Sequence, residues 1–206
     1  MDIQEYLDEQ ERSPFSIWFN ALDVQAAAKV STALTRLSLG NTSNTKDVGS
    51  GILELKIDFG KGYRIYFGKD GEQLLISANK AKSHQPSCAG KTTSCERKVN
   101  IKMALTRDFK ETIQARANRD PKFRDALLTE GVEALLTGEV DLGKAILRDY
   151  INATIGFDDL AAKIGKPVKS VMRMFGPNGN PTAQNLFAVI SQLQKATGVS
   201  LAVSAA

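Results

Sequence analysis

One short run of alternating residues constrains the fold of this chain more than any other feature. Within residues 53–59, apolar side chains alternate with Glu54, Lys56 and Asp58. A period of two predicts a β-strand with one buried face. From residue 109 onward the apolar residues recur at three and four positions instead, which predicts helices. The sequence therefore predicts an α+β first part and an all-α second part.

Two helices are predicted before this strand. Ser13 and Pro14 form a typical helix start, and the apolar residues after them have helical spacing. A second apolar face runs through residues 24–39 and ends at Gly40, which suits the left-handed end of a helix. We expect these segments to form a helical hairpin, followed by a polar loop at residues 41–51.

Two more strands are predicted after the first, at residues 63–67 and 74–76, each preceded by a turn that contains glycine. The three strands form a predicted antiparallel meander. With the two helices packed on one face, this gives a small α+β domain. The other face carries the charged residues of the alternating run.

The charged face of the predicted sheet is the first candidate site. If the hairpin is symmetric about Lys61, Lys56 lies opposite Tyr66 and Asp58 lies opposite Arg64. These residues form either a functional surface or a solvated face with cross-strand ion pairs, and the pattern alone fits both interpretations.

The periodic patterns stop between the two parts. Residues 77–102 contain Pro86 and Gly90 and carry 6 basic and 1 acidic residues. This composition predicts an irregular linker. A basic tract of this kind attracts nucleic acid without reading its sequence, but most such tracts are only solvated charged segments. We therefore predict three regions: 1–76, 77–102 and 103–206.

The two cysteines of the chain, Cys88 and Cys95, fall in this linker with the single histidine, His84. A structural zinc site needs four ligands, and no second cysteine pair completes one. We expect two free thiols and no metal or other cofactor. The first residues lack the pattern of a signal peptide, and no apolar run reaches the roughly 18 residues of a membrane span. We therefore expect a cytoplasmic protein without membrane contact.

The second part is predicted to be helical throughout. The expected helices cover residues 109–117, 121–136, 142–155, 157–164, 167–175 and 182–196. Two of them meet at Gly165, and so short a connection predicts a steep crossing that Ala161 is small enough to allow. The apolar contacts of the later helix are expected from Val168, Val171 and Met172.

This corner has the pattern of a helix-turn-helix, whose second helix lies in the major groove of DNA. The donors expected on its exposed face are Lys166, Lys169, Ser170 and Arg173. The turn at residues 176–181 adds two asparagines that suit phosphate contacts, Asn178 and Asn180. The alternative interpretation is an ordinary helical corner with solvated lysines.

The second part also resembles a known family. Its motifs are Ser170-Val171-Met172-Arg173-Met174-Phe175-Gly176-Pro177, Asn180-Pro181 and Asn185-Leu186-Phe187. They are similar to the signature of the antidote proteins of HigA type in chromosomal toxin–antitoxin modules. The resemblance extends from Met103 to Val203 and implies a repressor of its own operon. Because helix-turn-helix repressors bind mainly as dimers, we expect a homodimer on operator DNA.

The first part resembles the cognate toxins. Residues 54–60 read Glu-Leu-Lys-Ile-Asp-Phe-Gly, and residues 62–71 read Gly-Tyr-Arg-Ile-Tyr-Phe-Gly-Lys-Asp-Gly. They are similar to killer proteins of HigB type in the RelE/ParE superfamily. The resemblance implies a ribosome-dependent endoribonuclease that cleaves mRNA. Lys56 and Arg64 would stabilise the transition state at the phosphate, and Tyr66 would stack on a base.

The chain departs from the toxin pattern after Ile76. These toxins continue into further basic residues and a C-terminal helix, whereas residues 77–102 resemble out-of-frame translation between two neighbouring genes. Met103 would then be the former antidote start. We expect a fused toxin–antitoxin chain with a working DNA-binding half and a neutralised or degenerate nuclease half.

Two alternatives stay open. The first is an active endoribonuclease inhibited by its fused antidote, whether the halves dock within one chain or between chains. The second is a structural or protein-interaction module that binds no nucleic acid.

Overall fold

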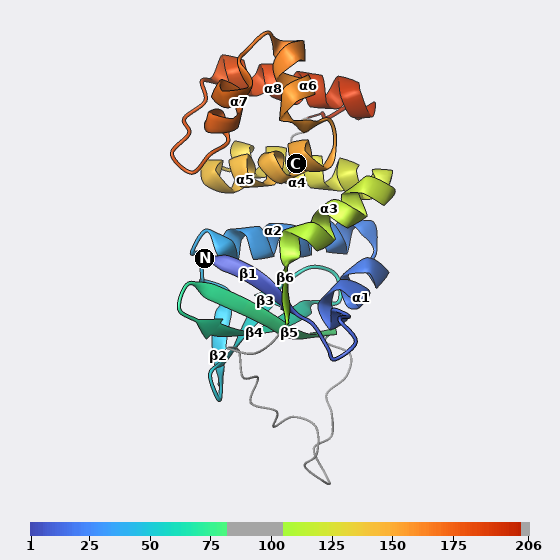
Figure 1. Cartoon of the computed structure of the whole chain (residues 1–206), viewed down its shortest axis with the longest axis vertical. Coiled ribbons are helices and arrows are strands. Elements are labelled where there is room, and N and C mark those ends of the chain that lie inside the picture. The colour runs from blue at the N-terminus through green and yellow to red at the C-terminus, as the bar shows by residue number, and fades with distance from the viewer. Residues whose placement is uncertain (82–104, 203–206) are drawn as a thin grey trace. The chain divides into compact units, whose positions relative to one another are not determined.

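The computed structural model describes residues 1–81 and 105–202, which contain eight helices and a six-stranded sheet (Figure 1). The fold is mixed α+β. The chain divides into two compact units, Met1–Thr112 and Ile113–Ala206. The sheet lies in the first unit, and the second unit is helical.

The sheet of the first unit has the strand order β2-β3-β4-β5-β1-β6. Strands β1 and β5 pair in parallel, and the other neighbouring pairs are antiparallel. The strands are β1 (Asp2–Tyr6), β2 (Thr45–Gly49), β3 (Ile52–Ile57), β4 (Tyr63–Asp70), β5 (Gln73–Ala81) and β6 (Thr106–Asp108).

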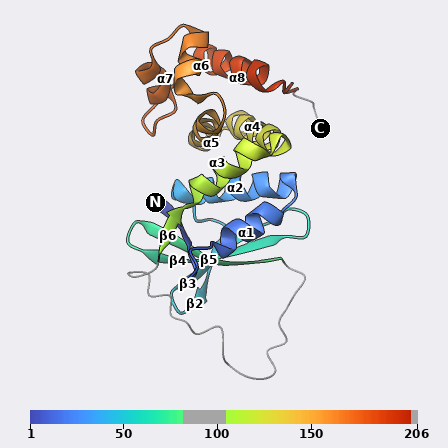
Figure 2. The same ribbon diagram turned by 45° about the vertical axis from the view of Figure 1, so that its right-hand side comes forward.

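Helices α1 (Pro14–Ala21) and α2 (Val24–Ser38) lie on one face of this sheet (Figure 2). The predicted cap at Ser13 is confirmed, because its hydroxyl accepts the Ser16 amide at 2.9 Å. Asp23 caps α2 in the same way, and Gly40 has the predicted positive φ after its end. The apolar sides of these helices and of the central strands form the core.

The sheet is larger than the predicted meander. The predicted polar loop at residues 41–51 contains β2, an exposed edge strand without apolar alternation. Strand β5 continues to Ala81, past the predicted end at Ile76. Strand β1 shows no apolar alternation in the sequence, because its buried positions are occupied by Ile3 and the charged Glu5.

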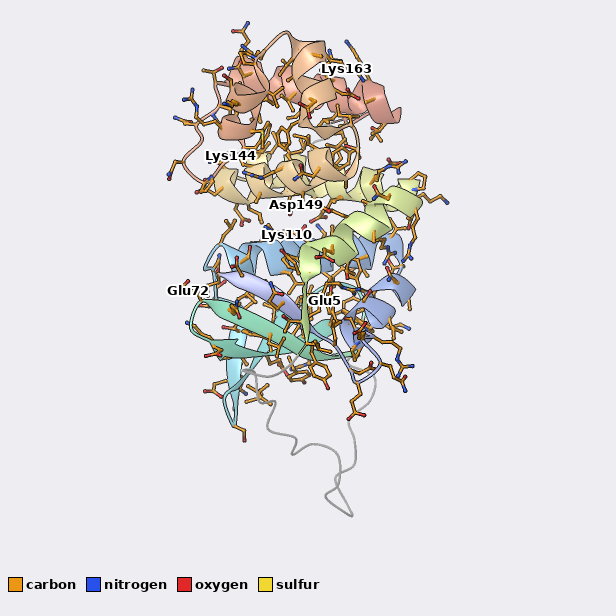
Figure 3. The ribbon with its side chains drawn as sticks, viewed as in Figure 1. Glu5, Glu72, Lys110, Lys144, Asp149 and Lys163 are labelled. Atoms are coloured by element: carbon orange, nitrogen blue, oxygen red, sulfur yellow. The ribbon has the colours of Figure 1, made fainter. Side chains whose placement is uncertain are left out.

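Strand β6 corrects the prediction of an all-helical second part. It pairs with β1, and Arg107 lies opposite Glu5 in the register. The Arg107 guanidinium forms an ion pair with the Glu5 carboxylate at 3.0 Å, and Glu5, labelled in Figure 3, is fully buried. A strand of three residues is too short to show a period, which is why the sequence did not reveal it. Residues 106–112 thus belong to the first unit.

The second unit is a helical array. Its helices are the end of α3 (Phe109–Arg119), α4 (Pro121–Leu136), α5 (Val140–Ala153), α6 (Gly156–Ile164), α7 (Val168–Met174) and α8 (Ala183–Thr197). Helices α4 and α5 pack closely because Gly143 has no side chain: a Cβ there would lie 2.6 Å from Leu135 Cγ. Helices α6 to α8 gather on one side of this pair (Figure 1).

The predicted helices of this part are confirmed, with bounds that differ by a few residues at most. Several other predictions lie outside the described residues: the two cysteines and His84, most of the linker, and the proposed junction at Met103. In the part of the chain that the structure describes, no helix is both long and apolar enough to cross a membrane.

Candidate functional site

The helical corner between α6 and α7 has the predicted geometry at its turn. Gly165 ends α6 with φ 65° and ψ 39°, in the left-handed region. The Lys166 amide donates to the Ala161 carbonyl at 3.0 Å, so the turn closes with the hydrogen-bond pattern common at glycine-ended helices. Pro167 then occupies the position before α7. Three residues, 165–167, separate the two helices, so the connection is as short as the sequence predicts.

The corner is held by apolar contacts on its inner side. Leu160, Ala161 and Val171 are at most 1% exposed, and the rings of Phe157 and Phe175 have centroids 6.5 Å apart. These residues place α7 firmly on α6. The expected core role of Val168 and Met172 is not borne out in full. Val168 is half-buried, and Met172 is exposed because it follows Val171 by one position and points to another face of α7.

The predicted donors of the corner differ in exposure. Lys169 and Arg173 are exposed, whereas Lys166 and Ser170 are half-buried. Among the described residues, no carboxylate forms an ion pair with any of these three cations. The exposed side of the corner therefore carries positive charge that no neighbouring acid neutralises.

Arg173 and Ser170 face a further element, the loop between α7 and α8. An open pocket of about 240 Å³ is formed where this loop meets α7 and the start of α8. Four predicted residues line it: Ser170, Arg173, Asn178 and Asn180. Lys166 and Lys169 are not among its lining residues. The structure thus brings the asparagines of the turn together with one cation of the predicted set.

The pocket also contains residues that the sequence analysis missed. Thr182 and Asn185 contribute from the first turn of α8, where the Thr182 hydroxyl accepts the Asn185 amide at 3.4 Å. The N-cap pattern before α8 is the signal that would have pointed to them. Lys144 of α5 contacts this loop, since its Nζ donates a hydrogen bond to the Gly179 carbonyl at 2.7 Å. No local sequence pattern indicates this contact.

The charged face of the sheet is the second candidate site, and its register differs from the prediction. Lys56 lies opposite Arg64, and Glu54 lies opposite Tyr66. The predicted pairing of Lys56 with Tyr66 and of Asp58 with Arg64 is wrong, because the strands are shifted by two residues relative to the predicted register. The connection is longer than a hairpin symmetric about Lys61 requires, because the last pair is Ile57 with Tyr63 and residues 58–62 lie between the strands. Within it, the Gly62 amide donates to the Phe59 carbonyl at 2.9 Å. A shift of two residues keeps each side chain on the predicted face.

Glu54 organises this face. Its side chain is 9% exposed and accepts hydrogen bonds from the Arg64 guanidinium and from the Tyr66 hydroxyl, the latter at 2.8 Å. Burial, and then the hydrogen bond to Glu54, raises the pKa of Tyr66 above its ordinary value of 10.0. The alternating pattern predicts Glu54 on this face but does not indicate Arg64 as its partner, because the predicted register pairs Arg64 with Asp58.

Lys56, the other predicted cation of the sheet face, is paired as well. Lys56 forms an ion pair with Asp58, two residues later in the chain, at a distance of 2.8 Å. Both side chains are largely exposed. The structure therefore brings Lys56, Arg64 and Tyr66 onto one face, each beside a carboxylate. This is the arrangement expected of a face stabilised by its own ion pairs.

Comparisons with known proteins found limited similarity. A protein of Haemophilus influenzae, described as an uncharacterized protein, is 40% identical over 63 residues. The match covers 30% of this chain and 64% of that protein, so the chain spans somewhat less than two thirds of the relative's length. No family model matches the chain, and no solved structure matches it.

Proposed function

We propose that the second unit is a DNA-binding antitoxin module, which binds operator DNA through α7 and the loop after it and represses its own operon. The observation that supports this most is the set of unpaired cations at the α6–α7 corner. Lysine and arginine side chains without acidic partners bind the phosphate backbone favourably, because counterions condensed on DNA are released.

The dimensions of α7 fit this role. The helix has 7 residues and, with its side chains, a diameter of about 10–12 Å, which the major groove, about 12 Å wide, admits. Its exposed side carries Lys169 and Arg173, whose cationic groups can donate to backbone phosphates as well as to base edges. A dimer would present two such helices about 34 Å apart to a palindromic site.

In the same proposal, the first unit is the neutralised or degenerate half of a toxin–antitoxin fusion. The support comes from the sheet face. A phosphate held by Arg64 would compete with Glu54, which already accepts its hydrogen bond, and one held by Lys56 would compete with Asp58. Such competition lowers the affinity of a cation for a second anion.

The alternative is an active endoribonuclease that acts on mRNA at the ribosome and is inhibited by the fused antidote. Arg64 and Tyr66 lie together on one open face of the hairpin, which favours this reading. Expression of residues 1–112 tests it, since this fragment keeps Arg107, the partner of the buried Glu5. Growth arrest that Arg64→Ala abolishes would support the alternative, and normal growth would remove it.

The DNA-binding proposal is tested by a gel-shift titration of the full chain on the duplex immediately upstream of its coding sequence. We expect salt-sensitive binding that is tighter than binding to a duplex of the same composition in scrambled order. Equal affinity for both duplexes, or no shift with either, would contradict the proposal.

A further inference from the structure

Lys144 is a lysine in an unusual position. It lies on α5 in the interior of the second unit, where it is 5% exposed and is labelled in Figure 3. Its Nζ lies 2.7 Å from the Gly179 carbonyl and 2.8 Å from an oxygen of Asp141. Lysine is almost never fully buried without such partners, because its charge is costly to desolvate. An apolar residue at this position would fill the space without that cost.

The partner of Lys144 is equally constrained. A Cβ on Gly179 would lie 2.3 Å from the carbonyl oxygens of both Arg173 and Met174, so the loop is folded tightly against the end of α7. The Gly179 amide also donates to the Gly176 carbonyl at 2.9 Å, which closes a turn. The loop is therefore packed rigidly on the end of α7, and the hydrogen bond from Lys144 connects it to α5.

The consequence concerns the residues on either side of Gly179. Asn178 and Asn180 line the same open pocket as Arg173 and Ser170. A DNA strand that contacts Arg173 would therefore meet amide donors that are already in place. Groups that are ordered before binding lose little conformational entropy on binding, and this raises affinity without any new contact.

We propose that Lys144 is a positioning residue of the DNA interface, an inference that rests on the proposed function. It does not touch DNA. Through the Gly179 carbonyl it fixes the α7–α8 loop so that Asn178 and Asn180 donate hydrogen bonds to a backbone phosphate next to the site contacted by Arg173. The loop thereby sets the register of α7 on the duplex.

The test measures the affinity of the full chain for the upstream duplex over a series of salt concentrations. Lys144→Met is compared with Lys122→Met, a matched control at an exposed position of α4 in the same unit. For Lys144→Met we expect about tenfold weaker binding, the loss typical of one hydrogen bond to a charged oxygen. The salt slope should stay unchanged, because the lost donors are uncharged amides.

Arg173→Ala is the internal reference for a direct contact. Loss of a cation that touches phosphate reduces the salt slope by about 1. If Lys144→Met also reduces the slope by that amount, Lys144 itself contacts DNA and the positioning role is wrong. Unchanged affinity of Lys144→Met would overturn the inference outright.

A general loss of stability is separated from positioning by a double-mutant cycle. In a chain that already carries Asn178→Ala and Asn180→Ala, Lys144→Met should have no further effect on affinity, because the groups it positions are gone. An equal loss in both backgrounds would mean that Lys144 only stabilises the fold, and would contradict the inference. If wild type binds the duplex and Lys144→Met binds equally well, the inference fails alone. If wild type does not bind, the proposed function fails.

Discussion

The sheet face and the helical corner both carry lysine and arginine side chains, but in the described part of the chain these cations are ion-paired on the sheet and unpaired at the corner. On the sheet, Arg64 is paired with Glu54 and Lys56 with Asp58. At the corner, Lys169 and Arg173 are exposed with no acidic partner among the described residues. A count of basic residues does not reveal this difference, because it depends on which carboxylates the fold places beside them.

The comparison teaches where a polyanion can bind. A phosphate at the corner would meet cations without an ion pair in the described ranges, whereas a phosphate at Arg64 or Lys56 would have to displace a carboxylate first. The residue types of both surfaces suit a nucleic acid, but we expect the binding free energy of a phosphate to be more favourable at the corner.

The largest effect is expected at the corner. The double substitution Lys169→Ala with Arg173→Ala should weaken binding to the upstream duplex by roughly 100-fold, since one base-edge contact is worth about 1–3 kcal/mol and a phosphate contact adds to it. The matched pair on the sheet, Lys56→Ala with Arg64→Ala, should leave the affinity unchanged. Gel-shift titration of both variants checks this, and equal losses would break the contrast.

A smaller effect is expected when the sheet face loses its central acid. Glu54→Gln should lower the free energy of unfolding by about 1–2 kcal/mol, because hydrogen bonds to a charged, nearly buried group are stronger than neutral ones while the half-exposed Arg64 can be rehydrated. Urea unfolding followed by circular dichroism measures the change. A stability equal to wild type would show that the ion pair adds nothing to the fold.

The same substitution should change a titration. Because the pKa of Tyr66 is raised by burial and by Glu54, this group contributes stability that is present below pH 10 and lost as the pH rises through the raised pKa. Glu54→Gln removes the carboxylate charge and so weakens the hydrogen bond from the Tyr66 hydroxyl, which should lower the pKa of Tyr66, although burial keeps it raised. Absorbance titration of tyrosinate, with Tyr66→Phe to identify the signal, measures this, and an unmoved transition would contradict the assigned contact.

The smallest effect is expected for the exposed pair on the same face. Asp58→Asn removes the partner of Lys56 and should change the free energy of unfolding by less than about 1 kcal/mol, because water screens the attraction. Urea unfolding beside Glu54→Gln gives the comparison directly. A loss as large as that of Glu54→Gln would mean that exposure does not separate the two pairs.

Much of the fold follows from local patterns in the sequence. The helices of the second unit show clear spacing, and glycine at residue 165 marks the turn because its left-handed conformation suits few other residues. The caps at Ser13 and Gly40 are local as well. Each of these signals lies within a few residues of the feature that it predicts.

What escaped prediction depends on residues distant in the chain. The pairing of β1 with β6 joins Glu5 to Arg107, and neither strand shows an apolar period. The contact of Lys144 with Gly179 spans two helices, and a buried lysine looks in the sequence like any exposed one. The hairpin register was missed because its glycine-rich turn allows more than one centre.

The most direct test of the central claim is a salt titration of the full chain on the upstream duplex beside its scrambled counterpart. If α7 binds operator DNA, we expect tighter binding to the upstream duplex at every salt concentration, with an affinity that falls as salt rises and a slope that Arg173→Ala makes shallower by about 1. Equal affinity for the two duplexes, or a slope that Arg173→Ala leaves unchanged, would contradict it.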